Sequence, residues 1–347
     1  MKLFQWHFGL YLIPLAFLLP MSNVQAAVNC TASMPTVDLG SITSTNADNT
    51  NITVNINYKC NSTYVNSRRL YVCLAVDGGS YDPTITLPRY MSQGTTTPNI
   101  PRLAFTMTLP NGTLLSTRNN ANLKSEYKSV LHNIPGGGSI NIDVPIKISL
   151  LPNNGNISAT PGSYTNNFTG GNTALTTHVS PLGGDGSQLD CLKVDQGSIR
   201  FPFTVQATVI KECKITANPD ILDLGSNPAN KKNIAGNSTI GVTCTNNAPY
   251  NIGLAPATSD PLGTVNTGSG LLNGTGSNTD KVPYQLRSKD GADGKIWGNT
   301  ATSTSLGNGV AGIGNGNNQN YPVYVTVPNA DFKPDTYTDT VTIKVNY

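Results

Sequence analysis

Residues 52–60 read ITVNINYKC, and apolar and polar side chains alternate through this stretch without a break. In an extended chain the isoleucine, valine, tyrosine and cysteine side chains therefore lie on one face, and the threonine, asparagine and lysine side chains lie on the other. Such alternation is typical of a strand that packs one face on a hydrophobic core. The stretch predicts a half-buried β-strand.

The same alternation recurs in residues 140–150, 199–209 and 341–347. Only 12% of the residues are charged, and the chain contains 34 glycines and 23 prolines. This composition disfavours long helices and favours short strands joined by many turns. The sequence therefore predicts an all-β fold, and residues 27–347 are long enough for two β domains.

The N-terminus has the layout of a secretory signal peptide. Residues 1–26 contain one lysine, Lys2, then an apolar run at 10–19, then small and polar residues that end at Ala26. The apolar run is too short to span a bilayer. We therefore expect export through the periplasm and a mature chain that begins at Ala27.

All six cysteines follow the predicted signal peptide, and an even number in an exported chain favours disulfides. An internal repeat reduces the possible pairings. Each copy has a cysteine, then the run VDLGS at 37–41 or LDLGS at 222–226, then a second cysteine at nearly the same spacing. A zinc site is the alternative, but the chain has no CxxC motif and no histidine cluster. The repeat and its remainder predict three disulfides: Cys30–Cys60, Cys213–Cys244 and Cys73–Cys191.

The repeat continues downstream. PIKISL at 145–150 and PGSYTN at 161–166 correspond to PVYVTV at 322–327 and PDTYTD at 334–339. These matches predict two domains of one plan, an N-terminal domain over residues 27–210 and a C-terminal domain over residues 211–347.

The two copies differ in their last strand. The first copy ends with a long loop and a further strand within 199–209, whereas the second copy has one strand, 341–347, before the chain ends. A sandwich without its last strand leaves an apolar groove and unpaired backbone groups, which another chain can fill by adding a strand. The alternative is a sandwich that is already complete at its final residue. We expect the acceptor groove at Val341, Ile343, Val345 and Tyr347.

The predicted mature N-terminus is short. Only Ala27, Val28 and Asn29 precede Cys30, whereas a typical strand has about 5–6 residues. The chain is therefore expected to accept a strand but not to donate one. Such a subunit can occupy only the distal end of a linear polymer.

Short motifs of the second copy resemble spore coat U domains. They are TCT at 243–245, YNI at 250–252, PYQL at 283–286, IWG at 296–298 and PVY at 322–324, in that order. Together with the signal peptide and the first copy, they make the chain similar to tip adhesins of archaic, Csu-type chaperone-usher pili. The resemblance implies immunoglobulin-like sandwiches, the second completed by a donor strand, and a place at the pilus tip on the cell surface. It also implies a periplasmic chaperone, an outer-membrane usher and an adjacent pilin as partners, and a role in attachment to abiotic or host surfaces and in biofilm formation.

Apolar residues in turn-rich parts of the N-terminal domain are the candidates for surface contact. The closing strand leads into the linker, so the loop before that strand should lie at the far end of the domain. Exposed apolar side chains there would bind hydrophobic surfaces by burying area. Alternatively, these residues fold into the core, polar loops bind a carbohydrate, or the chain is a structural pilin or coat subunit without a ligand. The candidates are Leu109, Pro110, Leu114, Leu115, Ile134, Pro135, Ile157, Leu175, Val179, Pro181 and Leu182.

The sequence shows no arrangement typical of an enzyme. His132 and His178 lie in turn-rich contexts without a neighbouring nucleophile or carboxylate. The run DGADG at 290–294 resembles part of a calcium loop, but it lacks the terminal glutamate and reads as a hairpin turn. The formal net charge of +3 does not suggest nucleic-acid binding. We expect no enzymatic activity, no cofactor, no metal and no nucleic-acid partner.

Overall fold

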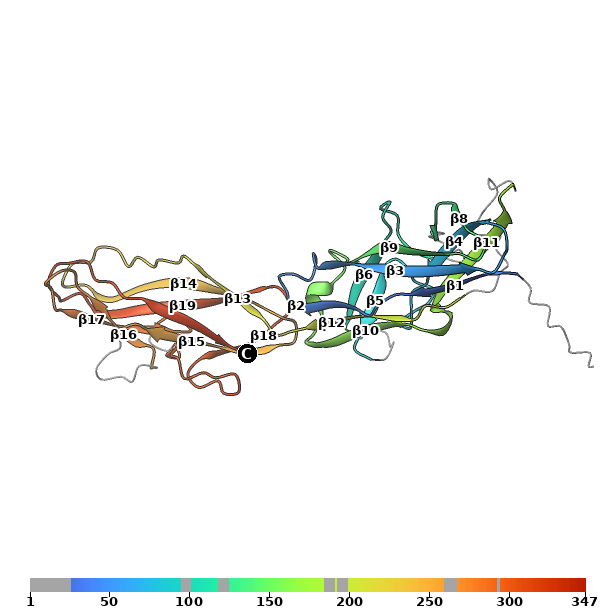
Figure 1. Ribbon diagram of the computed structural model, residues 1–347. Helices are drawn as coiled ribbons and strands as arrows, with labels where there is room; N and C mark the ends of the chain where they lie inside the picture. Colours follow the sequence, from blue (N-terminus) through green and yellow to red (C-terminus); the bar gives the residue numbers. More distant parts are fainter. Residues whose placement is uncertain are drawn as a thin grey trace, which may run out of the picture.

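The computed structural model describes residues 26–94, 101–117, 125–183, 191, 199–258, 267–291 and 294–347. In these ranges the chain consists of β-strands and two short 3-10 helices, η1 (Asn156–Ser158) and η2 (Gly170–Asn172). None of the helices in the described ranges is long and apolar enough to cross a membrane. The predicted signal peptide lies outside the described residues except for Ala26. The all-β prediction is confirmed (Figure 1).

Strands β1 to β12 form a first sandwich with one large and one small sheet. The order in the large sheet is β1 (Val28–Ser33), β3 (Asn51–Ser62), β9 (Ser139–Leu150), β6 (Arg102–Thr108), β5 (Arg89–Ser92), β10 (Gly162–Phe168), β12 (Phe203–Val209) and β2 (Val37–Ile42). The order in the small sheet is β11 (Thr173–Pro181), β4 (Arg68–Val76) and β7 (Tyr127–Lys128), with β8 (His132–Ile134) also paired to β4. A single hydrophobic core includes residues of both sheets.

The core side chains of the first sandwich follow the alternation of the sequence. In β3, Ile56, Tyr58 and Cys60 are fully buried, and Ile52 and Val54 are half-buried against the same core. The closing strand β12 is also alternately buried, with its four apolar residues inside. Full burial of one such side chain stabilises the fold by about 1.5–3 kcal/mol. Strand β12 is therefore a substantial part of this core.

Strands β13 to β20 form a second sandwich. Its larger sheet has the order β13 (Cys213–Asn218), β14 (Lys232–Cys244), β19 (Asn318–Asn329), β17 (Lys281–Arg287) and β16 (Ser269–Asn273). Its smaller sheet has the order β18 (Val310–Ile313), β15 (Pro249–Pro256) and β20 (Val341–Asn346). Trp297 is buried in the core, and its indole N–H donates to the Ile252 carbonyl at 2.9 Å.

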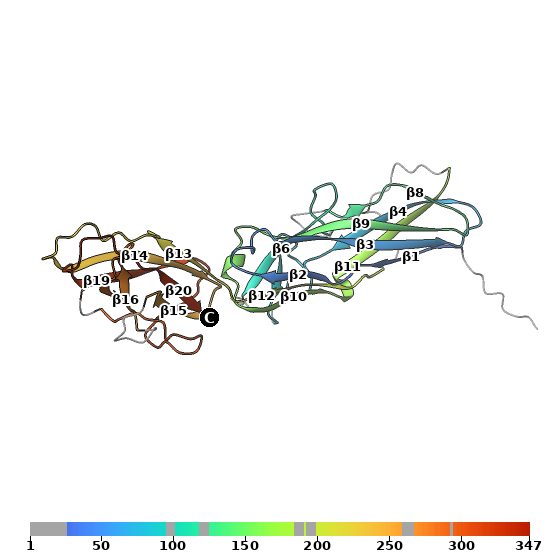
Figure 2. The ribbon, with the colours of Figure 1, turned by 60° about the vertical axis from the view of Figure 1, so that its left-hand side comes forward.

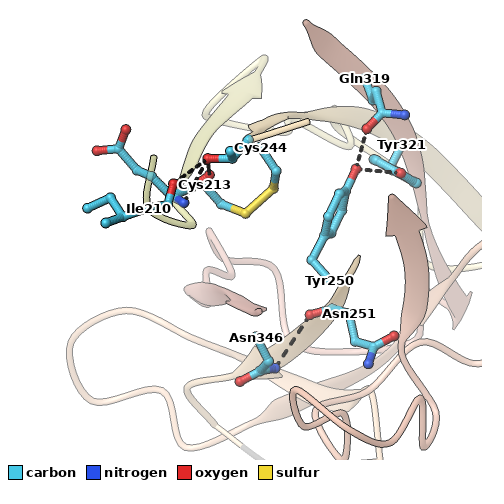
Figure 3. The surroundings of a disulfide bond; sticks show 10 residues. Ile210, Cys213, Cys244, Tyr250, Asn251, Gln319, Tyr321 and Asn346 are labelled. Atoms are coloured by element: carbon cyan, nitrogen blue, oxygen red, sulfur yellow. Dashed lines mark hydrogen bonds between the residues drawn. A yellow bond between two sulfur atoms is a disulfide. The ribbon is translucent and has the colours of Figure 1, made fainter. Parts of the chain in front are cut away.

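The structure contains all three predicted disulfides. Cys30 in β1 lies opposite Cys60 in β3, and Cys213 in β13 lies opposite Cys244 in β14, so each bond joins an edge strand to its neighbour. Figure 3 shows the second of these bonds beside Ile210. The third disulfide ties Cys73 in β4 to Cys191. The repeated disulfides thus hold equivalent strands of the two sandwiches.

The two sandwiches lie end to end in both ribbon views (Figures 1 and 2). Hydrogen bonds join them at the junction: the Thr45 hydroxyl donates to the Glu212 carboxylate at 3.4 Å, and the Asn246 amide donates to the Ser158 carbonyl at 2.6 Å. The Thr245 hydroxyl donates to the Ile210 carbonyl at 3.0 Å and fixes the connecting segment. The far end of the first sandwich, where β1 begins, is called the distal end below.

Candidate functional site

The larger sheets of the two sandwiches follow the same plan up to the point of closure. In the first sandwich, Thr165 of β10 pairs with Ser92 of β5. In the second, Thr338 pairs with Asn273 of β16 in the same way, which places residues 335–339 in the position of β10. The sequence repeat aligns Thr165 with Thr338. Residues 335–339 therefore form the counterpart of the strand that β12 covers in the first sandwich.

Equivalent tyrosines hold both of these segments. The Tyr164 hydroxyl donates to the carbonyl of Thr160 at 2.8 Å, and the Tyr337 hydroxyl donates to the carbonyl of Lys333 at 2.7 Å. Each bond closes back over four residues, as in the tyrosine corner of immunoglobulin-like sandwiches. The difference lies in burial, because Tyr164 is fully buried and Tyr337 is only half-buried. The second tyrosine thus lacks a cover that the first one has.

The missing cover corresponds to β12. In the first sandwich β12 pairs with β10 on one side and, in parallel, with β2 on the other. Val37 and Leu39 of β2 are consequently 1% and 7% exposed. Their repeat counterparts, Leu222 and Leu224, are half-buried and belong to no strand. Within the described ranges, no strand of the second sandwich takes the place of β12.

A groove of about 1080 Å³ lies between these uncovered segments. One wall consists of residues 217–229 and the other of residues 329–341, and the core side chains form its floor. Val341 and Ile343, two of the four residues expected in the acceptor groove, line it. The prediction is corrected for Val345 and Tyr347, which are not part of the lining. β20 runs from the groove toward the junction, where Val345 packs on the core and Tyr347 is 44% exposed.

Polar contacts hold the 335–339 wall in place. The Asp335 carboxylate accepts from the Thr275 backbone N–H and the Asn278 amide, both at 2.7 Å. Hydrogen bonds from the Thr275 hydroxyl and from Asn278 hold the pKa of Asp335 below its ordinary value. The Tyr284 hydroxyl donates to Asp339 at 2.7 Å, and burial together with this carboxylate raises the pKa of Tyr284. The wall is therefore pre-formed while the groove is open.

Four of the predicted surface-binding residues are buried in the core of the first sandwich, and their predicted exposure is wrong. They are Leu109, Leu115, Ile134 and Leu175, which are at most 5% exposed. Leu115 turns inward because its backbone N–H bonds to the carbonyl of Met107 and closes the hairpin onto the sheet. Leu175 belongs to β11, opposite Leu74, and is not a loop residue.

Three further candidates lie away from the distal end. Pro110 is exposed and Leu114 half-buried at the turn after β6, whose last residue pairs with Lys147, well inside β9. Ile157 is half-buried in η1, near Gly316 of the second sandwich. It therefore lies at the junction. Val179 lies nearer the distal end but packs half-buried against the core as part of β11.

The distal end brings together the remaining candidates and one residue that the sequence analysis missed. Arg68 at the start of β4 pairs with Ile134 on one side and Pro181 on the other, so Pro135 and Leu182 lie just beyond it, on either side of β4. Gly137 donates its backbone N–H to Tyr64 at 2.9 Å and brings the 63–67 loop alongside. Val65 in that loop is 94% exposed and Leu182 is 45% exposed. We refer to the exposed residues Val65, Pro135, Pro181 and Leu182 as the distal patch.

One histidine of the first sandwich, His132, has a structural partner. His132 bonds through Nε2 to the Tyr58 hydroxyl at 2.7 Å, and burial lowers the pKa of His132 and raises that of Tyr58. One group of potential metal ligands occurs among the described residues, Cys73, Glu126 and Cys191. Its two sulfur atoms are bonded to each other. This group has the chemistry of a disulfide and not of a metal centre.

Comparison with known families and structures gives one family match and several similar structures. Residues 199–344 match the model of the Spore Coat Protein U domain. No curated protein matches the chain. Among solved structures, the chain is similar to the CsuC–CsuE chaperone–tip adhesion subunit complex of archaic Csu pili from Acinetobacter baumannii. The identity is 15%, 92% of this chain and 100% of that chain are covered, and the TM-score is 0.47. It is also similar to the CupB6 tip adhesin from Pseudomonas aeruginosa, with 12% identity, coverage of 92% and 93%, and a TM-score of 0.38.

Proposed function

We propose that this chain, which matches the Spore Coat Protein U domain over residues 199–344, is the tip adhesin of a chaperone-usher pilus. Residues 27–210 are the adhesin domain, and residues 211–347 are the pilin domain that joins it to the next subunit. The partners are a periplasmic chaperone, an outer-membrane usher and the adjacent pilin, and the final location is the pilus tip at the cell surface. The function is binding, not catalysis.

The observation that carries this proposal is the contrast between the two sandwiches. The first fills its own groove with β12, whereas the second has an open groove between two walls in the same relative positions. Open apolar walls and unpaired strand edges are an aggregation hazard unless another chain supplies the strand. Addition of a strand from a chaperone or a neighbouring subunit removes the hazard and forms the attachment.

The distal patch supports a role in surface attachment. It lies at the end of the first sandwich opposite the junction, and it presents Val65 and Leu182 to solvent. The guanidinium of Arg68 lies 4.1 Å from the centre of the Tyr64 ring beside it. Apolar side chains held on short turns bind an apolar surface by removing their area from water, at about 25 cal/mol per Å². Attachment at this end leaves the groove accessible at the other sandwich. In cells, such attachment would promote biofilm formation.

The proposal is tested in piliated cells that carry Val65→Ser together with Leu182→Ser. The expected result is loss of attachment to polystyrene, with normal secretion and with immunogold labelling of the subunit at fibre ends. Leu306→Ser is the matched control, because Leu306 is 41% exposed in the second sandwich. Labelling along the whole fibre would contradict a tip location. Unchanged attachment, or attachment abolished by simple sugars, would contradict the apolar mode of binding.

A further inference from the structure

The first sandwich contains a filled version of the groove that is open in the second. In this filled version, β12 carries one polar side chain that contacts the parallel neighbour β2. The Gln206 amide donates to Oδ2 of Asp38 at 3.1 Å. The other carboxylate oxygen, Oδ1, accepts from the backbone N–H of Gly40 at 2.7 Å, which fixes the orientation of the carboxylate. Asp38 thus uses one oxygen to hold its own turn and the other to bind the closing strand.

The second sandwich has the same turn without the closing strand. Oδ1 of Asp223 accepts from the backbone N–H of Gly225 at 2.8 Å. Gly225 has a φ of 72°, and Gly40 in the first copy has a φ of 74°, a left-handed conformation that favours glycine. Asp223 is exposed and lines the groove. Its Oδ2 atom therefore corresponds to the oxygen that Gln206 binds in the first copy.

The opposite wall defines how an incoming strand can pair. Thr338 directs its backbone N–H and C=O toward Asn273, at 3.0 and 2.8 Å. In an extended segment the neighbouring residues direct these groups to the other side, so Tyr337 and Asp339 present theirs to the groove. In the first copy the residue opposite Gln206 is Thr165, the counterpart of Thr338. A strand that pairs as β12 does therefore places one outward side chain between Thr338 and Asp223.

From this correspondence we infer that Asp223 sets the register of the incoming strand by accepting a hydrogen bond from it. The occupant is an extended segment of another chain with apolar residues at four alternate positions, and a donor side chain such as glutamine stands between the second and third of them. The pattern is that of Phe203, Val205, Gln206, Ala207 and Val209. This inference rests on the proposed function, since it needs a groove that accepts a strand.

A polar contact is needed because the apolar pattern alone leaves the register ambiguous. A slip of one residue turns the apolar side chains out of the groove and is strongly disfavoured. A slip of two residues keeps an apolar face inward and changes only which pocket each side chain enters. The donor side chain loses Asp223 after either slip. Asp223 therefore discriminates between registers that burial of apolar area separates poorly.

The test uses the full mature chain refolded with synthetic peptides that carry residues 201–210 and a common soluble tail. Three peptides have Gln, Glu or Leu at the position of Gln206. Binding is measured from Trp297 fluorescence during titration. Replacement of an attractive cross-strand pair by a like-charged one changes the free energy by about 1.4 kcal/mol, so the Glu peptide should bind about tenfold more weakly than the Gln peptide. The Leu peptide should fall between them.

The matched variants are Asp223→Asn and Asp220→Asn. An asparagine at 223 keeps an oxygen for the Gly225 turn but removes the charge, so the Glu peptide should regain most of its affinity. Asp220 lines the same groove outside the repeat position and should leave the order of the peptides unchanged. Equal binding of all three peptides, or an Asp220 effect as large as that of Asp223, would overturn the register role while leaving the groove function intact. Failure of every peptide to bind would overturn both.

Discussion

The two copies of the repeat offer a matched pair of substitutions, Leu39→Ala and Leu224→Ala. Both leucines occupy the same position of the run that precedes the glycine turn. Leu39 is 7% exposed beneath β12, so its truncation removes a core side chain and leaves a cavity. We expect Leu39→Ala to lower the free energy of unfolding by about 3 kcal/mol. Leu224 is half-buried at the open groove, so its truncation removes about half of the transfer free energy and leaves no enclosed cavity. We therefore expect Leu224→Ala to lower the free energy of unfolding by about 1 kcal/mol.

Urea unfolding measures the loss in the free energy of unfolding for each variant. Residues 27–347 contain a single tryptophan, Trp297, whose fluorescence reports on the second sandwich. Hydrogen exchange of peptides from β3 and β9 reports on the first. When the peptide of residues 201–210 fills the groove, Leu224 becomes covered, and the loss caused by Leu224→Ala should rise toward that of Leu39→Ala. Equal losses at both positions without the peptide would refute the reasoning, because Leu224 would then already be packed as in a closed sandwich.

Three further outcomes are expected. Arg89→Met should destabilise the first sandwich by about 3 kcal/mol or more in urea titrations. The buried guanidinium of Arg89 donates to four backbone carbonyl groups, which would lose their donor. A loss below about 1 kcal/mol would show that water takes the place of the guanidinium. The pKa of Asp335 is lowered from 3.8, so its ionised form stabilises the second sandwich above about pH 4, and this stabilisation is lost as the pH falls. Asp335→Asn should therefore weaken the pH dependence of the free energy of unfolding, followed by Trp297 fluorescence, in acid. An unchanged pH dependence would contradict this. Replacement of Cys73 and Cys191 by serine should destabilise the first sandwich by about 3–5 kcal/mol in urea titrations and leave the stability of the second sandwich unchanged. An equal loss of stability in the second sandwich would show that the two sandwiches unfold as one unit.

The fold was largely predictable because its determinants are local and repeated. Alternation along each strand reports which face is buried, and the duplicated cysteine and glycine turn positions report which strands are neighbours. Comparison of the copies also indicated which strand the second sandwich lacks, since that strand is present in the first copy. These signals need no knowledge of how the loops are arranged.

The surface-binding residues were harder to predict because exposure of a loop side chain depends on distant pairing. Leu115 follows an Asn-Gly turn like that of an exposed hairpin, yet the return strand folds onto Met107 and turns it inward. Ile157 lies in a polar loop that the topology places at the junction. In the sequence, Val65 is a single valine in a polar turn, which is only weak evidence for a binding residue. Its exposure follows from the loop of residues 135–138, which packs against the Val65 backbone. Such information is in the tertiary arrangement and not in the local pattern.

The end-to-end arrangement with a disulfide at the junction has a mechanical consequence. The covalent path for tension between the distal patch and the groove passes through residues 210–213, where the Thr245 hydroxyl accepts from the Glu212 backbone N–H at 3.0 Å. The load then reaches Cys213, whose disulfide shares it with Cys244 on the interior strand β14. Because the long strands run nearly along the molecular axis in Figure 1, pulling shears many ladder hydrogen bonds at once instead of unzipping them in turn. The arrangement therefore resists force along the line that joins the distal patch to the groove.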